Sequence, residues 1–404
     1  MQDPATGHHQ PQTEGAGLSG RALAERLTRE ALALGFAAMA VAPADRLDAG
    51  GARLDAWLAA GHDADLDYMR GGDRADPRAL LPGARSVIVA ALATPTPTLL
   101  RRSAQGEPLR GGVAAFARGT DYHLVMKEKL RALADALANA AGKSHHARIA
   151  VDTAPLLERE LAARAGLGFV GKSTLLIIPG IGTNVMLGEL ITDLAIDEGA
   201  AMPAGCGGCV ACIDACPTGA IVAAFVVDAR RCISYWTIEH HGLIPLEIRP
   251  LIGARIFGCD DCQAVCPFDA SASASPRPHA PELAGRIDQL GIVLTDLLSA
   301  GNASHRRLVR RTALRRVSRD VLARNAAVAL GNSGDRSVVP ALAQALASHP
   351  SALVRAHAAW ALGRLGGSRA EPALVAALAD PDPDVRREAA LARGELERAH
   401  PVAR

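Results

Sequence analysis

The residues with the clearest chemistry are eight cysteines, all between positions 206 and 266 of a 404-residue chain. The run "CGGCVACIDACP" spaces them as Cys206-x2-Cys209-x2-Cys212-x3-Cys216, followed by proline. In proteins with two 4Fe-4S clusters, this spacing lets three thiolates bind one cluster and directs the fourth to the other. A structural zinc site is the alternative, but four closely spaced cysteines ending in Cys-Pro suit a cubane better than paired zinc knuckles.

A second run, "CDDCQAVCP", supplies three of the remaining ligands but lacks a fourth, because isoleucine stands at position 256. We assign the missing ligand to the cysteine of "RRCISYW". The crossover of the fourth cysteine then divides the ligands between two clusters. Cluster one takes Cys206, Cys209, Cys212 and Cys266, and cluster two takes Cys216, Cys232, Cys259 and Cys262. Two clusters in one block predict one-electron transfer over a short distance.

The start of the chain contains no apolar stretch typical of a secretion signal, and we expect residues 1–17 to be disordered. The sequence has no run of 18 apolar residues, so no membrane span is expected. Clustered cysteines in such a chain favour metal ligation over disulfides. We therefore expect a cytoplasmic protein, and a monomer.

A different motif, "GLGFVGKST" from Gly166 to Thr174, fits the phosphate-loop pattern G-x-x-x-x-G-K-[ST]. A true phosphate loop leaves a strand and opens a helix, whose first amide groups bind phosphate. Here a predicted helix over 154–166 comes first and an apolar strand follows. We therefore interpret Gly166 as the glycine that ends the helix, and expect no nucleoside triphosphate site.

The elements that must position these motifs form an α/β domain over residues 18–200. Strands are expected where apolar, β-branched runs occur, and helices where apolar residues recur at helical spacing. The expected helices cover 18–34, capped by Ser19, and also 52–61, 121–142 and 154–166. The expected strands cover 36–44, 86–94 and 147–153, and a strand pair covers 173–180 and 183–196.

The rest of the chain divides into a cysteine block over 201–270, a Pro- and Ser-rich linker over 271–283, and a helical region over 284–404. The helical region repeats itself at intervals of about 31 residues, with units starting near Arg324, Arg355 and Arg386. Two short helices per unit are typical of HEAT-type solenoids. The fold class is therefore α+β: an α/β domain, a ferredoxin-like two-cluster domain and HEAT-like repeats.

A basic stretch precedes the repeats and holds eight arginines between 306 and 324 against one aspartate. Arg307, Arg311, Arg315 and Arg319 stand four residues apart, which predicts a stripe along one helix face. Phosphate contacts along such a stripe would make nucleic-acid binding strongly dependent on salt. The alternative is an ordinary solvated helix face.

Five stretches together resemble the epoxyqueuosine reductase family: "VDTAPLLERELAARAGLGFVGKSTLLI", "CGGCVACIDACPTGAI", "RCISYWTIEHHGLIP", "GCDDCQAVCPFD" and "RNAAVALGNSGD". The resemblance runs from about residue 18 to 395. It implies reduction of the epoxide of epoxyqueuosine at the tRNA wobble position, with cobalamin, two 4Fe-4S clusters and an unidentified electron donor. The α/β domain would bind cobalamin, as in the similar domain of reductive dehalogenases. Met126 replaces the glycine of a D-x-H-x-x-G motif that would begin at Asp121, so base-off cobalamin is expected.

The resemblance also implies roles for individual residues. Asp152 matches the family's proton donor, and the alternative is an aspartate that caps the helix after Pro155. Ser173 stands where many members have asparagine. The expected cobalamin-binding residues are Arg74, Asp152, Lys172, Ser173, Leu176, Ser234, Tyr235 and Asp260, and the expected tRNA-binding residues are His240, Arg311, Arg315, Arg316, Arg319 and Arg324.

Two other functions stay open on the residues alone. A small-molecule reductase similar to reductive dehalogenases is disfavoured by the missing twin-arginine start, the arginine stripe and the repeats. A ferredoxin-type carrier that docks a partner through its repeats would hold clusters but no cobalamin.

Overall fold

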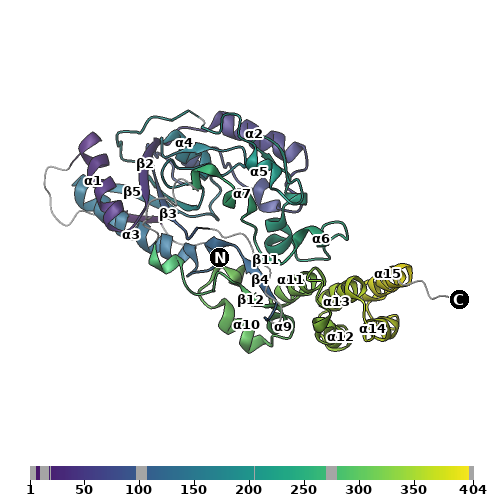
Figure 1. The fold of residues 1–404 in the computed structure, drawn as a ribbon. Helices are drawn as coiled ribbons and strands as arrows, with labels where there is room; N and C mark the ends of the chain where they lie inside the picture. The colour runs from purple at the N-terminus through teal and green to yellow at the C-terminus, as the bar shows by residue number, and fades with distance from the viewer. Residues whose placement is uncertain are drawn as a thin grey trace. The chain divides into compact units, whose positions relative to one another are not determined.

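The computed structural model describes residues 6–9, 18, 20–96, 107–203, 205–269 and 280–399 (Figure 1). Its contacts divide the chain into two compact units. Unit 1 comprises residues 1–97, 119–230 and 261–285, and unit 2 comprises 98–118, 231–260 and 286–404. This division crosses the expected 201–270 domain, because both units contain cysteine-bearing segments. No helix within the described ranges is long and apolar enough to cross a membrane.

Unit 1 is built on an antiparallel sheet with the strand order β1-β5-β8-β3-β2. β3 (Ser86–Ala93) is buried along its whole length, as its continuous apolar run predicts. The other strands are β1 (Thr6–His9), β2 (Ala38–Pro43), β5 (His145–Ala150) and β8 (Val185–Thr192). β8 therefore lies between β5 and β3, with a neighbour on each side.

Two expectations for this sheet are wrong. Residues 6–9 form β1 and pair with β5, because backbone hydrogen bonding to a strand edge does not need the apolar side chains that the sequence reading relied on. The remaining residues of the range 1–17, and the expected cap Ser19, lie outside the described residues. The expected strand pair over 173–196 is also absent, since β7 (Leu176–Ile177) pairs with β6 (Phe169–Val170) and not with β8.

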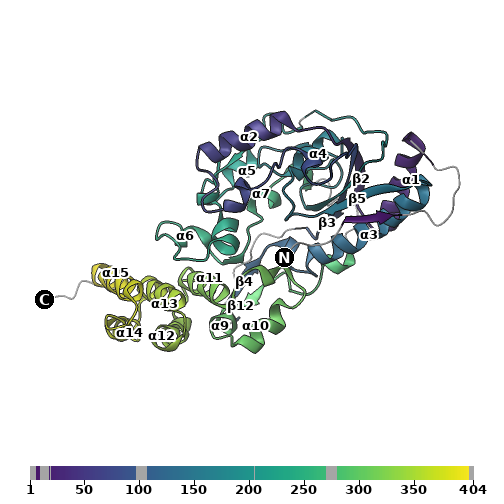
Figure 2. The same ribbon diagram turned by 180° about the vertical axis from the view of Figure 1, so that it is seen from behind.

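Helices pack on both faces of the sheet (Figures 1 and 2). α3 (Tyr122–Ala141) contacts β5 and β8 and packs with α1 (Gly20–Ala33), while α4 (Glu158–Arg164) contacts β2, β3 and β8. The Asp121 side chain caps α3 by accepting the His123 N–H, and Gly142 ends the helix at φ 61°. α2 (Asp48–Ala59) completes the helices expected before position 200.

The end of α4 settles the interpretation of the phosphate-loop match. Gly166 has φ 77°, its N–H donates to Ala163 O at 3.1 Å, and the Leu167 N–H donates to Ala162 O at 3.0 Å. These are the two hydrogen bonds of a Schellman motif. The Gly-Lys-Ser-Thr stretch forms a turn between β6 and β7, so the expected helix end is confirmed and no helix opens after the lysine.

The cysteine block of unit 1 contains two four-residue helices in contact, α5 (Ala211–Asp214) and α7 (Asp261–Ala264). Each helix lies within one of the two Cys-x2-Cys-x3-Cys-Pro runs. A short hairpin of β9 (Ile221–Ala223) and β10 (Val226–Val227) follows the first run. The two runs therefore adopt the same local structure.

Unit 2 begins with a three-stranded sheet in the order β11-β4-β12. Its strands are β4 (Arg110–Val113), β11 (Arg255–Phe257) and β12 (Ile292–Val293). The helical segments before the repeats are the π-helix η5 (Tyr235–Glu239), α6 (Arg249–Ile252), α9 (Leu294–Leu298) and α10 (Asn302–Val309).

The repeats form two rows of helices (Figures 1 and 2). One row contains α11 (Arg319–Gly331), α13 (Ala352–Leu365) and α15 (Pro383–Ala399), and the other contains α12 (Val339–Ser348) and α14 (Ala370–Ala377). Neighbours within and between rows pack together.

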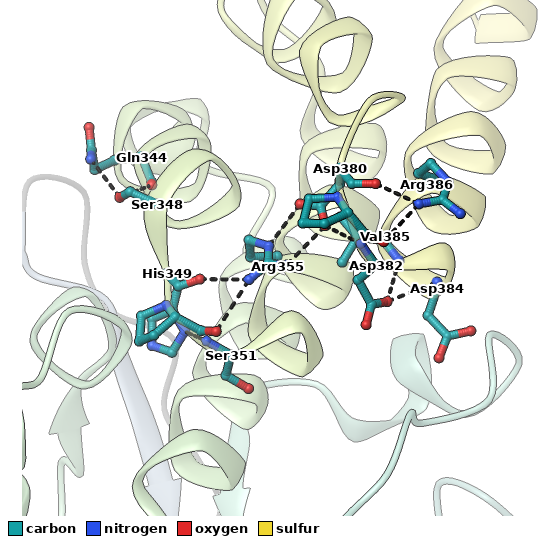
Figure 3. A network of polar contacts seen from close by, with 12 residues as sticks. Gln344, Ser348, His349, Ser351, Arg355, Asp380, Asp382, Asp384, Val385 and Arg386 are labelled. Carbon is teal, nitrogen blue, oxygen red and sulfur yellow. Dashed lines mark hydrogen bonds and ion pairs between the residues drawn. The ribbon is translucent and has the colours of Figure 1, made fainter.

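The arginine that opens a repeat has the same structural role in two successive repeats (Figure 3). Arg355 Nη1 donates to the carbonyls of His349 and Pro350 at 2.9 and 3.3 Å. Arg386 Nη1 donates to the carbonyls of Asp380 and Pro381 at 2.6 and 2.9 Å. In both repeats the acceptors lie six and five residues earlier, so this arginine stabilises the loop that enters its own helix.

The single helix expected for the basic stretch is wrong. α10 ends at Val309, Arg311 adopts a left-handed φ of 59°, and residues 313–316 form a 3-10 turn before α11 begins. Residues 312–314 are all buried, and an amphipathic helix cannot place three successive side chains on its one buried face. The arginines at four-residue spacing therefore do not share one helix face.

Candidate functional site

Asp152, the expected proton donor, follows the end of β5 with a left-handed φ of 50°. Such a conformation is uncommon for a residue other than glycine and costs of order 1–3 kcal/mol unless surrounding contacts hold it. Here the Asp152 N–H donates to Glu158 Oε1 at 2.6 Å. The N-cap position of α4 is Leu157, and no side chain caps the helix there, so the capping alternative for Asp152 is wrong.

His123 holds the carboxyl group of Asp152. Its Nε2 lies 3.1 Å from Asp152 Oδ2, and its Nδ1 lies 2.8 Å from Asp121 Oδ1. Burial by itself would lower the pKa of His123, but Asp121 and Asp152 outweigh it and raise that pKa to about 9. At neutral pH an imidazolium therefore lies between two carboxyl groups. The sequence reading considered Asp121-Tyr122-His123 only as an incomplete cobalamin motif and missed this contact.

Two glutamates complete the cluster around Asp152. Burial, and then the charge of Asp152, raise the pKa of Glu158 to about 7. Glu189, in β8, is fully buried, and burial together with Glu158 and Asp152 raises its pKa well above its ordinary value. Neither glutamate was singled out from the sequence, where both lie in ordinary helix and strand patterns.

Arg74 is the expected cobalamin contact with the clearest binding capacity. It is buried, its Nη2 donates to Tyr68 O at 2.5 Å, and its guanidinium lies 5.9 Å from the Tyr68 ring centre. Its Nε has no hydrogen-bond partner among the described residues. The Arg74 carbonyl accepts the Leu157 N–H, which places this residue beside the Asp152–Glu158 loop. Arg74 can therefore donate one more hydrogen bond to a polar ligand.

The other cobalamin contacts expected in unit 1 either bind protein groups or are buried. Lys172 Nζ donates to the carbonyls of Gly207 and Cys209 at 2.8 and 2.9 Å, so its charge lies at the first cysteine run. The Leu176 side chain lies in the apolar core, and Ser173 is buried. A Cβ atom at Gly171 would collide with the Ile177 side chain. Packing against Ile177 therefore explains why glycine stands at this position.

Electrostatic interactions link the four thiols expected in cluster one. Cys206 and Cys266 pack in one apolar group with Phe169 and Phe268. Burial, and then the nearby Cys206 and Cys209 thiols, raise the pKa of Cys212. An apolar shell around closely grouped thiols fits an iron–sulfur cluster.

Cys216, expected in cluster two, is surrounded by hydrogen-bond donors. The Ala220 N–H donates to its sulfur at 3.2 Å, and Thr218 Oγ1 lies 3.6 Å away. Burial alone would raise the pKa of Cys216, but the hydrogen bonds from Thr218 and Ala220 outweigh it and lower that pKa. A stabilised thiolate fits an iron ligand. Cys262 lies in α7, and the remaining expected ligands, Cys232 and Cys259, belong to unit 2.

Three expected cobalamin contacts lie in unit 2. Tyr235 is buried and its hydroxyl lies 3.3 Å from His240 Nδ1, while Ser234 is half-buried. Asp260 Oδ2 accepts the Ala115 N–H at 2.7 Å. Asp260 therefore has a structural contact within its own unit.

Comparison with known proteins decides the family. Three family models match: the 4Fe-4S double cluster binding domain over 205–269, Epoxyqueuosine reductase QueG, DUF1730 over 74–153, and HEAT repeats over 308–393. The epoxyqueuosine reductase of Alicycliphilus denitrificans is 40% identical over 354 residues, covering 83% of this chain and 96% of that protein. The chain belongs to the epoxyqueuosine reductase family.

Further relatives agree. The epoxyqueuosine reductase of Escherichia coli K12 is 38% identical, over 81% of this chain and 86% of that protein. A crystal structure of epoxyqueuosine reductase with a tRNA-Tyr epoxyqueuosine-modified tRNA stem loop has 32% identity and a TM-score of 0.84, covering 93% of this chain and 99% of that one. The two-cluster domain and the HEAT-like repeats expected from the sequence are confirmed.

Among the arginines expected to contact tRNA, Arg324 has no surface with which to do so. Arg324 is fully buried, and its guanidinium donates to the carbonyls of Trp236, His240 and Gly242 at 2.7 to 2.8 Å. Its charge therefore holds the segment after Cys232, and the prediction that it binds tRNA is wrong. Arg324 opens the first repeat, so no earlier repeat supplies a loop for it to stabilise. It stabilises the segment after Cys232 instead.

The other expected tRNA contacts keep accessible surface. Arg311 and Arg315 are exposed, and Arg316 is exposed while pairing with Glu239 at 3.0 Å. Arg319 and His240 are half-buried. Arg319 Nη2 pairs with Asp320 at 2.8 Å, so this arginine is partly neutralised.

Proposed function

We propose that this chain reduces epoxyqueuosine to queuosine at the wobble position of tRNA, using two 4Fe-4S clusters and cobalamin, with Asp152 as proton donor. Its family membership carries the reaction class, and the Asp152 site supports the proton-donor role. Opening an epoxide and removing its oxygen as water consumes two electrons and two protons. When bound, the clusters and the cobalamin supply the electrons, so the protein's own residues must supply the protons.

The arrangement of Asp152 supports this role. The side chain is 37% exposed, so a substrate can reach it, while His123 orients the carboxyl group and Glu158 holds the backbone. Protonated Asp152 would donate its proton to the epoxide oxygen as negative charge develops there, and the His123 imidazolium would stabilise the carboxylate that this transfer leaves. Arg74, with its unpartnered Nε, would hold a polar group of the cobalamin.

The tRNA would bind through His240, Arg311, Arg315, Arg316 and Arg319, and the modified base would leave its stack to reach the carboxyl group. The relative of known structure with a tRNA stem loop supports tRNA as the substrate. We further propose that the protein acts in the cytoplasm as a monomer, with a separate electron donor.

The test is conversion of epoxyqueuosine to queuosine in tRNA by the protein loaded with iron, sulfide and cobalamin under a reductant. Asp152→Asn should lower turnover by about 100-fold or more, which is typical for loss of a general acid, with iron and cobalamin content unchanged. Asp193→Asn, which removes a surface partner of His146, is the matched control and should keep turnover. Near-normal turnover by Asp152→Asn would refute the role.

A further inference from the structure

A buried carboxyl group lies in the central part of the unit 1 sheet. Glu189 on β8 pairs directly with Ala150 on β5 and with Val89 on β3. Directly paired residues point to the same face, here the face that packs against α4 with Val89 and Ala150. Glu189 is fully buried, and its carboxyl oxygens have no hydrogen-bond donor among the described residues except the neighbouring carboxyl group of Glu158.

An unpartnered carboxylate in such a place is very costly, so the group binds a proton instead. Ala150, the cross-strand partner of Glu189, is the last residue of β5. Asp152 follows Ala150 by two residues, so the register places Glu189 opposite the end of β5 that leads to Asp152. An apolar residue at position 189 would pack without this cost, so folding alone does not explain the glutamate.

Glu158 connects Glu189 to Asp152. It begins α4 and accepts the Asp152 N–H, and its carboxyl group lies within hydrogen-bonding reach of Glu189. Burial raises the pKa of both groups, and this contact adds to the rise for Glu189 and partly offsets it for Glu158. Accessibility rises in order along the three groups: Glu189 is buried, Glu158 is half-buried and the Asp152 side chain is 37% exposed. The carboxyl groups therefore lead from the interior of the sheet to the reacting position.

The cations that face this cluster come from two elements. His123 comes from α3 and contacts Asp152, and Arg159 comes from α4. The Arg159 side chain is exposed, and its guanidinium donates to the Thr174 carbonyl at 2.5 Å. Neither cation forms a hydrogen bond that satisfies the oxygens of Glu189, so Glu189 stays without a direct counter-ion.

We propose that Glu158 and Glu189 form a buried carboxyl pair that stores one proton and returns it to Asp152 after the first proton transfer. This inference rests on the proposed function, in which one epoxide takes two electrons and two protons to give an alkene and water. Asp152 gives the first proton to the epoxide oxygen and becomes a carboxylate. The pair then gives up its stored proton, Asp152 is protonated again, and the second transfer releases the oxygen as water. A proton stored beside Asp152 can reach it without passing through bulk solvent.

The first experiment detects the stored proton in the cofactor-loaded protein without substrate. Infrared difference spectra against pH should show a protonated carboxyl band at pH 7 that Glu189→Gln or Glu158→Gln removes or shifts. Glu160→Gln is the matched control from the same helix, where the carboxylate pairs with Arg53 at 2.7 Å, and it should leave the band unchanged. Absence of the band in the wild-type protein at pH 7 would overturn the proposal.

The second experiment follows turnover of epoxyqueuosine tRNA against pH. Because the pKa of Glu158 is about 7, the wild-type rate should fall as the pH rises through 7 and Glu158, the member of the pair that contacts Asp152, loses its proton. In Glu158→Gln and Glu189→Gln the rate at pH 6.5 should be about tenfold lower and the fall near pH 7 should disappear. Iron content, cobalamin content and the KM for tRNA should stay unchanged in both variants. These controls distinguish loss of the stored proton from general damage to the protein.

The two proposals fail differently. Wild-type protein that does not convert epoxyqueuosine tRNA overturns the proposed function, and the inference with it. Wild-type protein that is active, with both glutamine variants matching its rate and pH profile, overturns the proton store alone.

Discussion

Single charged residues set the chemistry of each site in unit 1. Lys172 donates to the carbonyls of Gly207 and Cys209 in the first cysteine run, which makes it a positive charge beside the expected cluster one. The reduction of a cluster adds negative charge, and nearby charge is one of the factors that set its potential. The corrin contact expected for Lys172 from the family resemblance is therefore better replaced by a role at the cluster.

Lys172→Gln should lower the midpoint potential of cluster one. Loss of the positive charge destabilises the reduced state, by on the order of tens of millivolts, where 59 mV corresponds to a tenfold change for one electron. A redox titration followed by electron paramagnetic resonance measures it. Lys143→Gln, which removes an exposed lysine elsewhere in unit 1, should leave the potential unchanged. Equal potentials in wild-type and Lys172→Gln proteins would contradict this role.

The imidazolium of His123 should make stability depend on pH. Because its pKa is raised from 6.5 to about 9 in the folded protein, its stabilising contribution is full below pH 6.5 and is lost as pH rises through 9. The loss has an upper limit of about 3 kcal/mol, at 1.36 kcal/mol per pKa unit. Urea unfolding at pH 6 and pH 9.5 should show that His123→Gln removes this part of the pH dependence.

His146→Gln removes a histidine that pairs with Asp193 at the surface, and serves as the control. It should retain the wild-type loss of stability between pH 6 and 9.5. The same pH dependence in His123→Gln as in wild type would refute a charged His123.

Some site residues could be predicted from the sequence because their chemistry fixes their spacing. Iron ligands must recur at short fixed spacings, so Cys206, Cys209 and Cys212 are visible in the letters alone. Asp152 was identified only through the family resemblance. Glu189 has no such spacing, and its importance comes from the register that pairs it with Ala150, which only the folded sheet determines.

At the scale of elements, helix ends were easier to predict than the path of the basic stretch. Gly166 and Gly142 end their helices because glycine readily adopts positive φ, a local property. The arginines between 306 and 324 look alike in sequence, but the turn at Arg311 and the burial of Arg324 depend on packing against distant segments of unit 2. Spacing by four residues could not reveal either fact.

Arg324→Ala should destabilise unit 2 by at least about 3 kcal/mol. It leaves the buried carbonyl of Trp236 and the half-buried carbonyls of His240 and Gly242 without their donor, and each unsatisfied buried group costs about 1–3 kcal/mol. Arg386→Ala removes the equivalent arginine of a later repeat, which is exposed, and should cost about 1 kcal/mol. Chemical denaturation measures both. Similar losses in the two variants would show that Arg324 has no special role in holding the segment after Cys232.

For the whole molecule, overall charge cannot attract tRNA. The 44 basic and 42 acidic side chains leave a formal net charge of only +2. Attraction to phosphates must therefore come from a local surface. Arg311 and Arg315 are both exposed, whereas Arg324 is buried and Arg319 pairs with an aspartate, so the exposed pair is the better candidate.

The double variant Arg311→Ala/Arg315→Ala should weaken tRNA binding and reduce its dependence on salt. Each phosphate contact contributes roughly 0.7 to 0.9 to the slope of log K against log salt, so loss of two contacts should reduce the slope by roughly 1.5. Binding titrations between low and physiological salt measure the slope. Arg21→Ala/Arg29→Ala removes two exposed arginines of α1 and should leave the slope unchanged. If both double variants kept the wild-type slope, tRNA binding through this part of unit 2 would be excluded, because released counterions report each phosphate contact directly.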